Sequence, residues 1–222
     1  MSKTLKTHSI FYSLQCEGPR ACQPAVFIRL SGCNMSPPCS FCDTDHITGA
    51  KDMEILTIVN EVVRWSQTNL VVITGGEPFI QDFSNLCRVL SKYDKHIQIE
   101  SNGIYLPQWY IDMVTSNDFN YSSIVCSPKN MIVDANMIVY AEAFKYVVEA
   151  GKLHEASGLP LSVYNPLNED KRGWIGPEQI YLQPMDQKDP VKNKANVQAA
   201  VASCLQHGYR LSLQQQKIIG CR

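Results

Sequence analysis

The chain carries, at residues 26–44, the stretch Val-Phe-Ile-Arg-Leu-Ser-Gly-Cys-Asn-Met-Ser-Pro-Pro-Cys-Ser-Phe-Cys-Asp-Thr. It begins with the apolar run Val26–Leu30, which is typical of a strand buried in a sheet. Three cysteines follow at once, Cys33, Cys39 and Cys42, with two prolines between the first and the second. Three thiolates so close together are soft ligands, and they suit an iron–sulfur cluster or a zinc ion.

Spacing alone leaves three interpretations of this triplet open. A four-iron cluster held by three cysteines keeps one iron without a protein ligand, open to a substrate or cofactor. A zinc ion would instead recruit His46 as a fourth ligand and close a structural Cys3His site. In the third interpretation the thiols bind no metal.

Outward from this stretch, short apolar runs alternate with segments of helical periodicity. We expect strands at 26–30, 70–74, 96–100, 123–126, 144–148, 180–183 and 210–213. We expect helices at 53–66, 79–90, 107–114 and 191–207, and a loop at 165–178. Alternation of this kind predicts a mostly parallel α/β sheet. About six units are too few for a closed eight-fold barrel, so we expect an incomplete, open (βα) barrel in a single domain, residues 1–222.

Composition excludes several classes of protein. The 222 residues are 45% hydrophobic and 18% charged, with a net charge of −1, which excludes a disordered chain and gives no global basic field for nucleic acid. No apolar run is long enough for a membrane helix, and Ile10–Leu14 is too short for a signal sequence. The odd count of nine cysteines is unlike a secreted disulfide framework. We therefore expect a cytoplasmic protein with no nucleic-acid or membrane partner, in which Cys87 and Cys204 are buried structural thiols.

The triplet and the turn Gly75-Gly76-Glu77-Pro78 after the next strand together resemble the radical S-adenosylmethionine (SAM) superfamily. Further motifs sharpen the resemblance to the 7-carboxy-7-deazaguanine synthase family, over nearly the whole chain. These are, in order, the segments at residues 11–18, 24–33, 42–44, 71–78, 127–129, 182–185 and 210–214.

The resemblance implies an open barrel of the radical SAM type, a [4Fe-4S] cluster, SAM and Mg²⁺. It implies a lyase of queuosine (7-deazapurine) biosynthesis that converts 6-carboxy-5,6,7,8-tetrahydropterin to 7-carboxy-7-deazaguanine with loss of ammonia. It also implies a homodimer and an electron donor such as flavodoxin. No side chain is expected to be catalytic beyond the cluster and SAM, because the cofactor carries the chemistry.

The resemblance also assigns roles to individual positions. Metal ligands are Cys33, Cys39 and Cys42 for the cluster and Thr44 for magnesium. The substrate is expected to contact Leu14, Gln15, Cys16, Glu17, Arg29 and Thr74. The SAM site is expected to comprise Phe41, Asp43, Gly76, Glu100, Ser127, Pro128, Lys129 and Gln183.

Structural alternatives stand beside some of these roles. Arg29 could form an ion pair with Glu100, Thr44 could cap a turn, and Lys129 could be a surface lysine. For the whole chain, the rivals are a related radical SAM enzyme with a different heterocycle or protein substrate, and a non-enzymatic zinc-binding domain.

The chain departs from the family pattern at several positions. Cys16 and Cys22 stand where glycine is usual, so a positive φ at position 16 would strain the backbone by about 1 kcal/mol. Five residues, not three, separate Cys33 from Cys39. Gln216 stands where the family commonly has histidine, and we expect either Arg222 to compensate for that loss or the substrate to differ.

Overall fold

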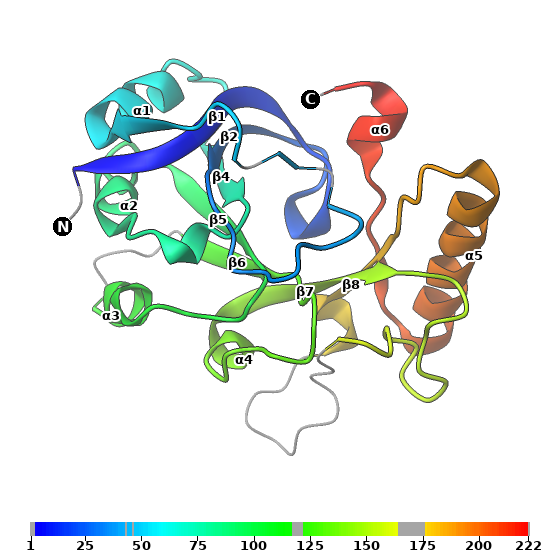
Figure 1. Cartoon of the computed structure of the whole chain (residues 1–222). Coiled ribbons are helices and arrows are strands. Elements are labelled where there is room, and N and C mark those ends of the chain that lie inside the picture. The colour runs from blue at the N-terminus through cyan, green and yellow to red at the C-terminus, as the bar shows by residue number, and fades with distance from the viewer. Residues whose placement is uncertain (1–2, 43, 46, 117–121, 164–175, 222) are drawn as a thin grey trace.

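The computed structural model describes residues 3–42, 44–45, 47–116, 122–163 and 176–221. Nine strands of this part of the chain form one sheet in the order β3-β1-β2-β4-β5-β6-β7-β8-β9 (Figure 1). The strands are β1 (Thr4–Gln15), β2 (Gln23–Leu30), β3 (Lys51–Glu54), β4 (Leu70–Gly75), β5 (His96–Ser101), β6 (Ser122–Cys126), β7 (Ala141–Val148), β8 (Ile180–Pro184) and β9 (Arg210–Leu211). The α-helices are α1 (Ile55–Val63), α2 (Ser84–Ser91), α3 (Gln108–Thr115), α4 (Met137–Tyr140), α5 (Pro190–His207) and α6 (Gln215–Ile219). Three short 3-10 turns, η1 (Gly18–Arg20), η2 (Pro78–Ile80) and η4 (Pro177–Gln179), complete the described elements.

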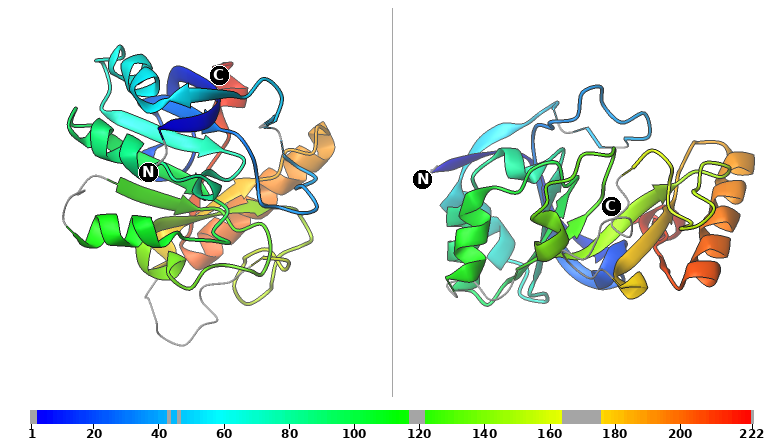
Figure 2. Two further views of the ribbon diagram at one scale, coloured as in Figure 1. Left: turned by 60° about the vertical axis from the view of Figure 1, so that its left-hand side comes forward. Right: turned by 90° about the horizontal axis from the view of Figure 1, so that it is seen from below.

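The sheet is parallel from β2 to β9, and only β1 and β3 run antiparallel to their neighbours. The strand order begins at β3 and ends at β9, so the sheet is an open one. Helices α1, α2 and α3 stand along one flank of the molecule and α5 along the opposite flank (Figures 1 and 2). The expected open, mostly parallel α/β architecture is therefore confirmed.

Apolar side chains explain why the parallel strands lie at the centre. Val26, Ile28, Val71, Ile73 and Ile99 are fully buried in the main core cluster. These β-branched residues come from the neighbouring strands β2, β4 and β5 and stand at alternate positions, so they form one buried face of the sheet. Helix α1 closes this core with one apolar face, which includes Ile58 and Val62.

Several elements differ from the sequence prediction, and the strand expected at 210–213 is limited to β9 at 210–211. The strand β1, which lies next to β2, was not expected, because most of its side chains are only partly buried and show no clean alternation. The expected helix at 53–66 is shorter, since residues 51–54 pair with β1 as β3. The expected helix at 79–90 is broken: η2 ends at Ile80, and the Asp82 carboxylate then accepts a hydrogen bond from the Ser84 amide, 3.0 Å away, at the start of α2.

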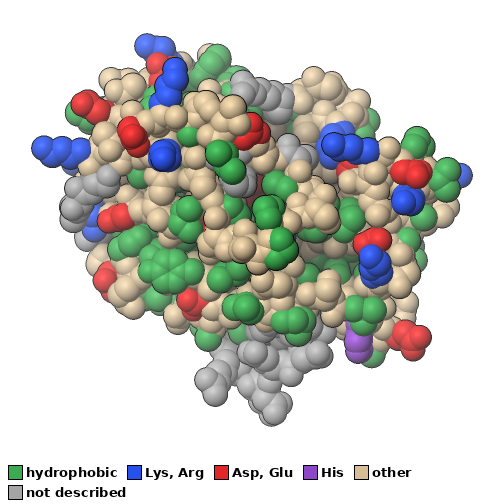
Figure 3. Space-filling model, in the orientation of Figure 1, with side chains coloured by type: hydrophobic (Ala, Val, Ile, Leu, Met, Phe, Trp, Pro, Cys, Tyr) green, Lys and Arg blue, Asp and Glu red, His purple; other side chains and the backbone are tan. Residues whose placement is uncertain are grey.

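The molecular surface is mixed in charge. On the face seen in Figure 3, Lys and Arg side chains lie mainly toward the edges and are interspersed with acidic ones. Of the expected loop at 165–178, residues 165–175 lie outside the described residues and 177–179 form η4. No helix in the described ranges is both long and apolar enough to span a lipid bilayer.

Candidate active site

The three cysteines of the triplet lie on the loop that follows β2, at the carboxyl edge of the parallel strands. Cys33 and Cys39 are partly buried and Cys42 is exposed, and all three are free thiols. Burial raises the pKa of the Cys39 thiol, Lys129 opposes that rise, and the neighbouring Cys42 and Cys33 add to it. Cys39 is thus within electrostatic reach of the other two thiols, although no three Cys, His, Asp or Glu side chains of the described residues stand together at metal-binding distances.

The glycine turn after β4 packs directly against this loop. A Cβ on Gly76 would overlap the carbonyl oxygen of Gly32 and approach the Cβ of Cys33 to 2.9 Å. Gly75 adopts a φ of +142°, which L side chains rarely adopt. The Glu77 amide donates to the same Gly32 carbonyl at 2.9 Å. Glycine is therefore required here by the close approach of two backbones, and Gly76 lies directly beside the cysteine loop.

Glu77 anchors this turn from inside the protein. Its carboxylate accepts hydrogen bonds from the Phe79 amide at 3.1 Å, the Ser101 hydroxyl at 2.9 Å and the Asn102 amide at 2.7 Å. Burial raises the pKa of Glu77 to about 7, even though these donors act in the opposite direction. Glu77 therefore ties the turn to the end of β5, a structural role that fits its near-complete burial.

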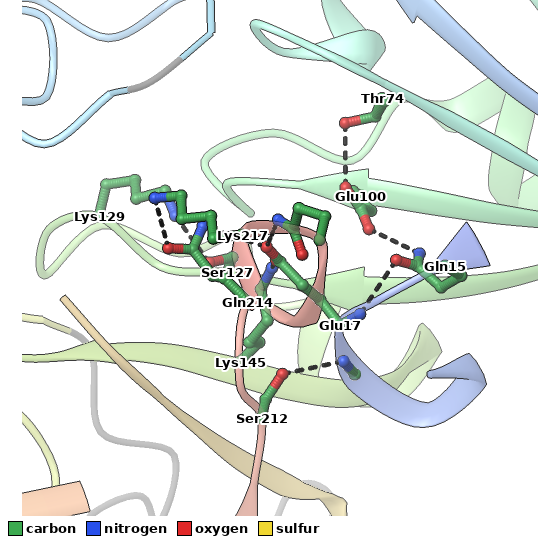
Figure 4. Close-up of polar contacts among 12 residues, drawn as sticks. Gln15, Glu17, Thr74, Glu100, Ser127, Lys129, Lys145, Ser212, Gln214 and Lys217 are labelled. Atoms are coloured by element: carbon green, nitrogen blue, oxygen red, sulfur yellow. Dashed lines mark hydrogen bonds and ion pairs between the residues drawn. The ribbon is translucent and has the colours of Figure 1, made fainter. Parts of the chain in front are cut away.

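A chain of polar contacts links β1, β4 and β5 on one wall of the cavity (Figure 4). Glu100 accepts from the Gln15 side-chain amide at 2.9 Å and from the Thr74 hydroxyl at 3.0 Å. The guanidinium of Arg29 lies 5.4 Å from the centre of the Phe11 ring. Glu100 thus orients two residues expected to contact substrate, while Arg29 comes from the adjacent strand β2.

Glu17 is the centre of a second polar cluster, into which the C-terminal segment reaches. Its carboxylate pairs with the Lys145 ammonium and accepts from the side-chain amides of Gln214 at 3.2 Å and Gln216 at 2.9 Å. Burial alone would raise the pKa of Glu17, but the Lys145 charge and these donors outweigh it and lower the pKa to about 2. The side-chain oxygen of Gln216 is buried and has no hydrogen-bond partner among the described residues.

A third group of residues lies at the ends of β6 and β8. Lys129 donates to the Ser127 hydroxyl at 2.7 Å, and its ammonium lies 5.7 Å from the centre of the Phe41 ring. Burial, and then the positive charge of Lys145, lower the pKa of Lys129, which is partly buried and lines the cavity. Gln183 is 6% exposed, and its side-chain oxygen has no partner within the described ranges.

One cavity of about 720 Å³ brings these groups together. It is lined by nearly all of the residues expected at the site: Leu14, Gln15, Cys16, Glu17, Arg29, Cys33, Cys39, Phe41, Cys42, Thr44, Thr74, Gly76, Glu100, Ser127, Lys129 and Gln183. Pro128 is buried beside the cavity without lining it. Asp43 and His46 lie outside the described residues, so the proposed zinc ligand His46 has no described position.

Two expectations about individual positions change with the structure. Cys22, not Cys16, has a positive φ, of 70°, so the backbone strain expected at position 16 falls at position 22. Lys145 was not anticipated, although a lysine inside the apolar strand β7 is itself a signal, because lysine is almost never buried unless paired. Cys87 is fully buried as expected, whereas Cys204 is only partly buried.

The residues present fit an iron–sulfur cluster with SAM. The donor set is three thiols on one loop, which suits iron and sulfide, and Gly76 presents backbone beside them. Gln183 also lines this cavity, and its buried side-chain oxygen has no hydrogen-bond partner among the described residues, so it is an acceptor still to be satisfied.

Comparison with known proteins gives a consistent result. The sequence profile of the Radical SAM superfamily matches residues 27–162. A 7-carboxy-7-deazaguanine synthase of Rhodospirillum rubrum is 35% identical, over 98% of this chain and 92% of that protein. Another, of Bacteroides thetaiotaomicron, is 34% identical over 98% of both chains. The crystal structure of QueE from Escherichia coli superposes with a TM-score of 0.69 at 24% identity, covering 95% of this chain and 93% of that one, and supports the fold.

Proposed function

Because the chain belongs to the 7-carboxy-7-deazaguanine synthase family of radical SAM enzymes, we propose that it converts 6-carboxy-5,6,7,8-tetrahydropterin to 7-carboxy-7-deazaguanine with loss of ammonia. The observation that carries this proposal is the shared cavity. Residues assigned to the cluster, to SAM and to the pterin line it together, although they come from seven separate segments of the chain.

Cys33, Cys39 and Cys42 would hold the [4Fe-4S] cluster and leave one iron to SAM. When bound, the cluster and SAM supply one-electron cleavage of the sulfonium and, from it, hydrogen-atom abstraction. The protein's part is placement. Gly76 allows SAM to approach the backbone, while Gln183 and Ser127 present polar atoms at the ends of β8 and β6.

The substrate would be oriented by charged groups that line the cavity. The guanidinium of Arg29 offers a planar pair of donors to the pterin carboxylate, and Mg²⁺ on the Thr44 hydroxyl would share that negative charge. Glu17 offers a carboxylate to the donor edge of the pterin ring. The low pKa of Glu17, about 2, keeps that carboxylate ionised at neutral pH.

The Glu100 contacts would hold rigid the cavity wall that β1, β4 and β5 form. Since Glu100 bonds both Gln15 and Thr74, loss of Glu100 would free two substrate-facing side chains at once. We therefore assign Glu100 a positioning role toward the substrate wall, in place of the direct cofactor contact expected from the sequence.

Assembly, location and partners extend the same proposal. We propose a single domain, a homodimer, a cytoplasmic location and a flavodoxin-like electron donor. The nine free cysteines support a reducing compartment. The substrate is a small molecule, as expected for the enclosed cavity.

The testing experiment is anaerobic turnover of the carboxy-tetrahydropterin with SAM, Mg²⁺ and dithionite, with product identified by mass spectrometry. Cys39→Ala is expected to remove iron and SAM cleavage, and Cys87→Ala, a buried thiol outside the cavity, is the matched control that should retain both. Iron and SAM cleavage without deazaguanine product would keep the radical SAM assignment and overturn the substrate. Full iron content in Cys39→Ala would overturn the ligand assignment.

A further inference from the structure

Two cysteines from opposite ends of the chain meet at the rim of the cavity. The sulfurs of Cys16 and Cys221 lie 3.7 Å apart, although 205 positions separate the residues in sequence. Cys16 is 4% exposed, follows β1 and lines the cavity, whereas Cys221 is partly exposed just beyond α6. Either thiol can donate a hydrogen bond to the other, and Cys16 also lies 3.5 Å from the Leu14 carbonyl oxygen.

The segment that carries Cys221 is held by polar contacts alone. Helix α6 has no buried residue. Three hydrogen bonds hold it in place. The Cys22 thiol donates to the Gln215 side-chain oxygen at 3.1 Å, the Gln216 side-chain amide donates to Glu17, and the Lys217 ammonium donates to Asp186 at 2.6 Å. A disulfide bond is about 2.05 Å long, so the two sulfurs must approach by about 1.7 Å to form one. Because no residue of α6 is buried as a whole, this movement leaves the hydrophobic core unchanged.

We propose that Cys16 and Cys221 are a disulfide-forming pair that fastens the C-terminal helix onto the loop after β1. The oxidant is a low-molecular-weight disulfide. The Cys221 thiolate attacks it and releases one small thiol, and the Cys16 thiolate then attacks the Cys221 sulfur of the mixed disulfide and releases the second. Two cysteine thiols are oxidised, one small disulfide is reduced, and the two protons leave on the two small thiols.

The surroundings of the two thiols decide the order of attack. Burial, followed by the contact with Cys221 and by the nearby Glu17, raises the pKa of Cys16 to about 11. Cys16 is therefore a poor first nucleophile, since the thiolate is the reactive form. Cys221 is the more exposed of the two and is reached first by an external disulfide.

The bond would act on the wall of the cavity. Gln214, Gln216 and Lys217 line the cavity on the segment just before Cys221. Fixing that segment to Cys16 would hold Gln216 on Glu17 and restrict any exchange of Gln216 for a ligand. This consequence for the pterin rests on the proposed function, whereas the bond itself does not.

Trypsin separates the relevant thiols cleanly. Cleavage after Lys and Arg places Cys16 in the peptide 7–20, Cys22 in 21–29 and Cys221 in 218–222. The cluster-loaded full chain is treated anaerobically with oxidised glutathione, its remaining thiols are alkylated, and the digest is analysed by mass spectrometry. The expected product is a linked pair of peptides 7–20 and 218–222, lighter than their sum by two hydrogen atoms and separated again by dithiothreitol.

Two variants and one further readout keep the test decisive. Cys221→Ser should abolish the linked peptide, and Cys22→Ser should leave it in place. In the oxidised parent, hydrogen exchange of the α6 amides should slow several-fold, and Cys221→Ser should show no such change. A glutathione adduct on Cys221 with Cys16 still alkylatable, or a link through Cys22, would overturn the pairing. A linked peptide without slower hydrogen exchange in α6 would overturn the proposal that the disulfide holds α6 against the loop after β1. Neither outcome depends on turnover, so both are separate from failure of the proposed reaction.

Discussion

Replacing Lys145 by methionine should expose how strongly the site depends on one buried ion pair. The Lys145 and Glu17 side chains are only 9% and 15% exposed. Removing one partner of a buried pair leaves the other charge uncompensated and typically costs about 3–5 kcal/mol. Methionine keeps the volume of the lysine stem, so little of this loss comes from packing.

The pKa of Glu17 determines how the stability loss in Lys145→Met changes with pH. In the parent chain the pKa of Glu17 lies at about 2, below its ordinary value of 4.5, so the carboxylate stabilises the fold above pH 4.5. That contribution, on the order of 3 kcal/mol, is lost as the pH falls toward 2. Without Lys145, burial acts against the charged form and raises the pKa of Glu17 above 4.5. The variant should therefore be weakest at neutral and higher pH and should approach the parent on acidification.

The assay is equilibrium urea unfolding of the reduced protein at several pH values. We expect Lys145→Met to lose about 3–5 kcal/mol at pH 7 and clearly less at pH 4.5. The double variant Glu17→Gln/Lys145→Met should recover part of that loss, because it removes the uncompensated charge. An equal loss at both pH values, together with a double variant no more stable than the single one, would refute the electrostatic reasoning.

Three further predictions concern single positions. Arg29→Ala should weaken pterin binding by about 1.5–3 kcal/mol, the range for a hydrogen bond to a charged group, with SAM affinity little changed; equal pterin affinity in calorimetry would return Arg29 to a structural role. Gly76→Ala should destabilise the fold by about 1–3 kcal/mol and abolish SAM binding, because its Cβ would overlap the Gly32 carbonyl; Gly151→Ala, with nothing within 4 Å, should keep SAM binding. Cys22→Gly should be more stable than Cys22→Ala by about 1 kcal/mol in urea unfolding, since both lose the thiol and only alanine is strained at a φ of 70°.

The sequence predicts the parallel strands well because their burial is uniform. Residues 70–74 and 96–100 lie within β4 and β5, where four of the six residues in each strand are buried and none is exposed. Strand β1 could not be predicted in this way, because it pairs at the edge of the parallel strands and seven of its successive residues are only partly buried. A half-covered strand carries neither a continuous apolar run nor a strict alternation.

The candidate site likewise contains residues that the sequence could place and residues that it could not. Residues that follow predicted strands, such as Gly76 and Ser127, could be placed at one edge from topology alone. Lys145 and Gln216 could not be placed there, because their positions depend on how β7 and the C-terminal segment return toward Glu17. Such long-range contacts leave no local pattern. Only the presence of a lysine within an apolar strand signals that a carboxylate must lie opposite it.

The departures from the family pattern at positions 16 and 22 have different physical explanations. At position 16 the backbone does not adopt a positive φ, so a side chain fits there without strain, and the thiol finds the Cys221 sulfur. At position 22 the φ of 70° favours glycine, and the cysteine accepts that strain while its thiol contacts Gln215 of α6. Both thiols therefore face the same returning segment, which also supplies Gln216 to Glu17. The departures at 16, 22 and 216 thus meet where the loop after β1 contacts the C-terminal segment, through Cys16 on Cys221, Cys22 on Gln215 and Gln216 on Glu17, and for that reason they should be varied together.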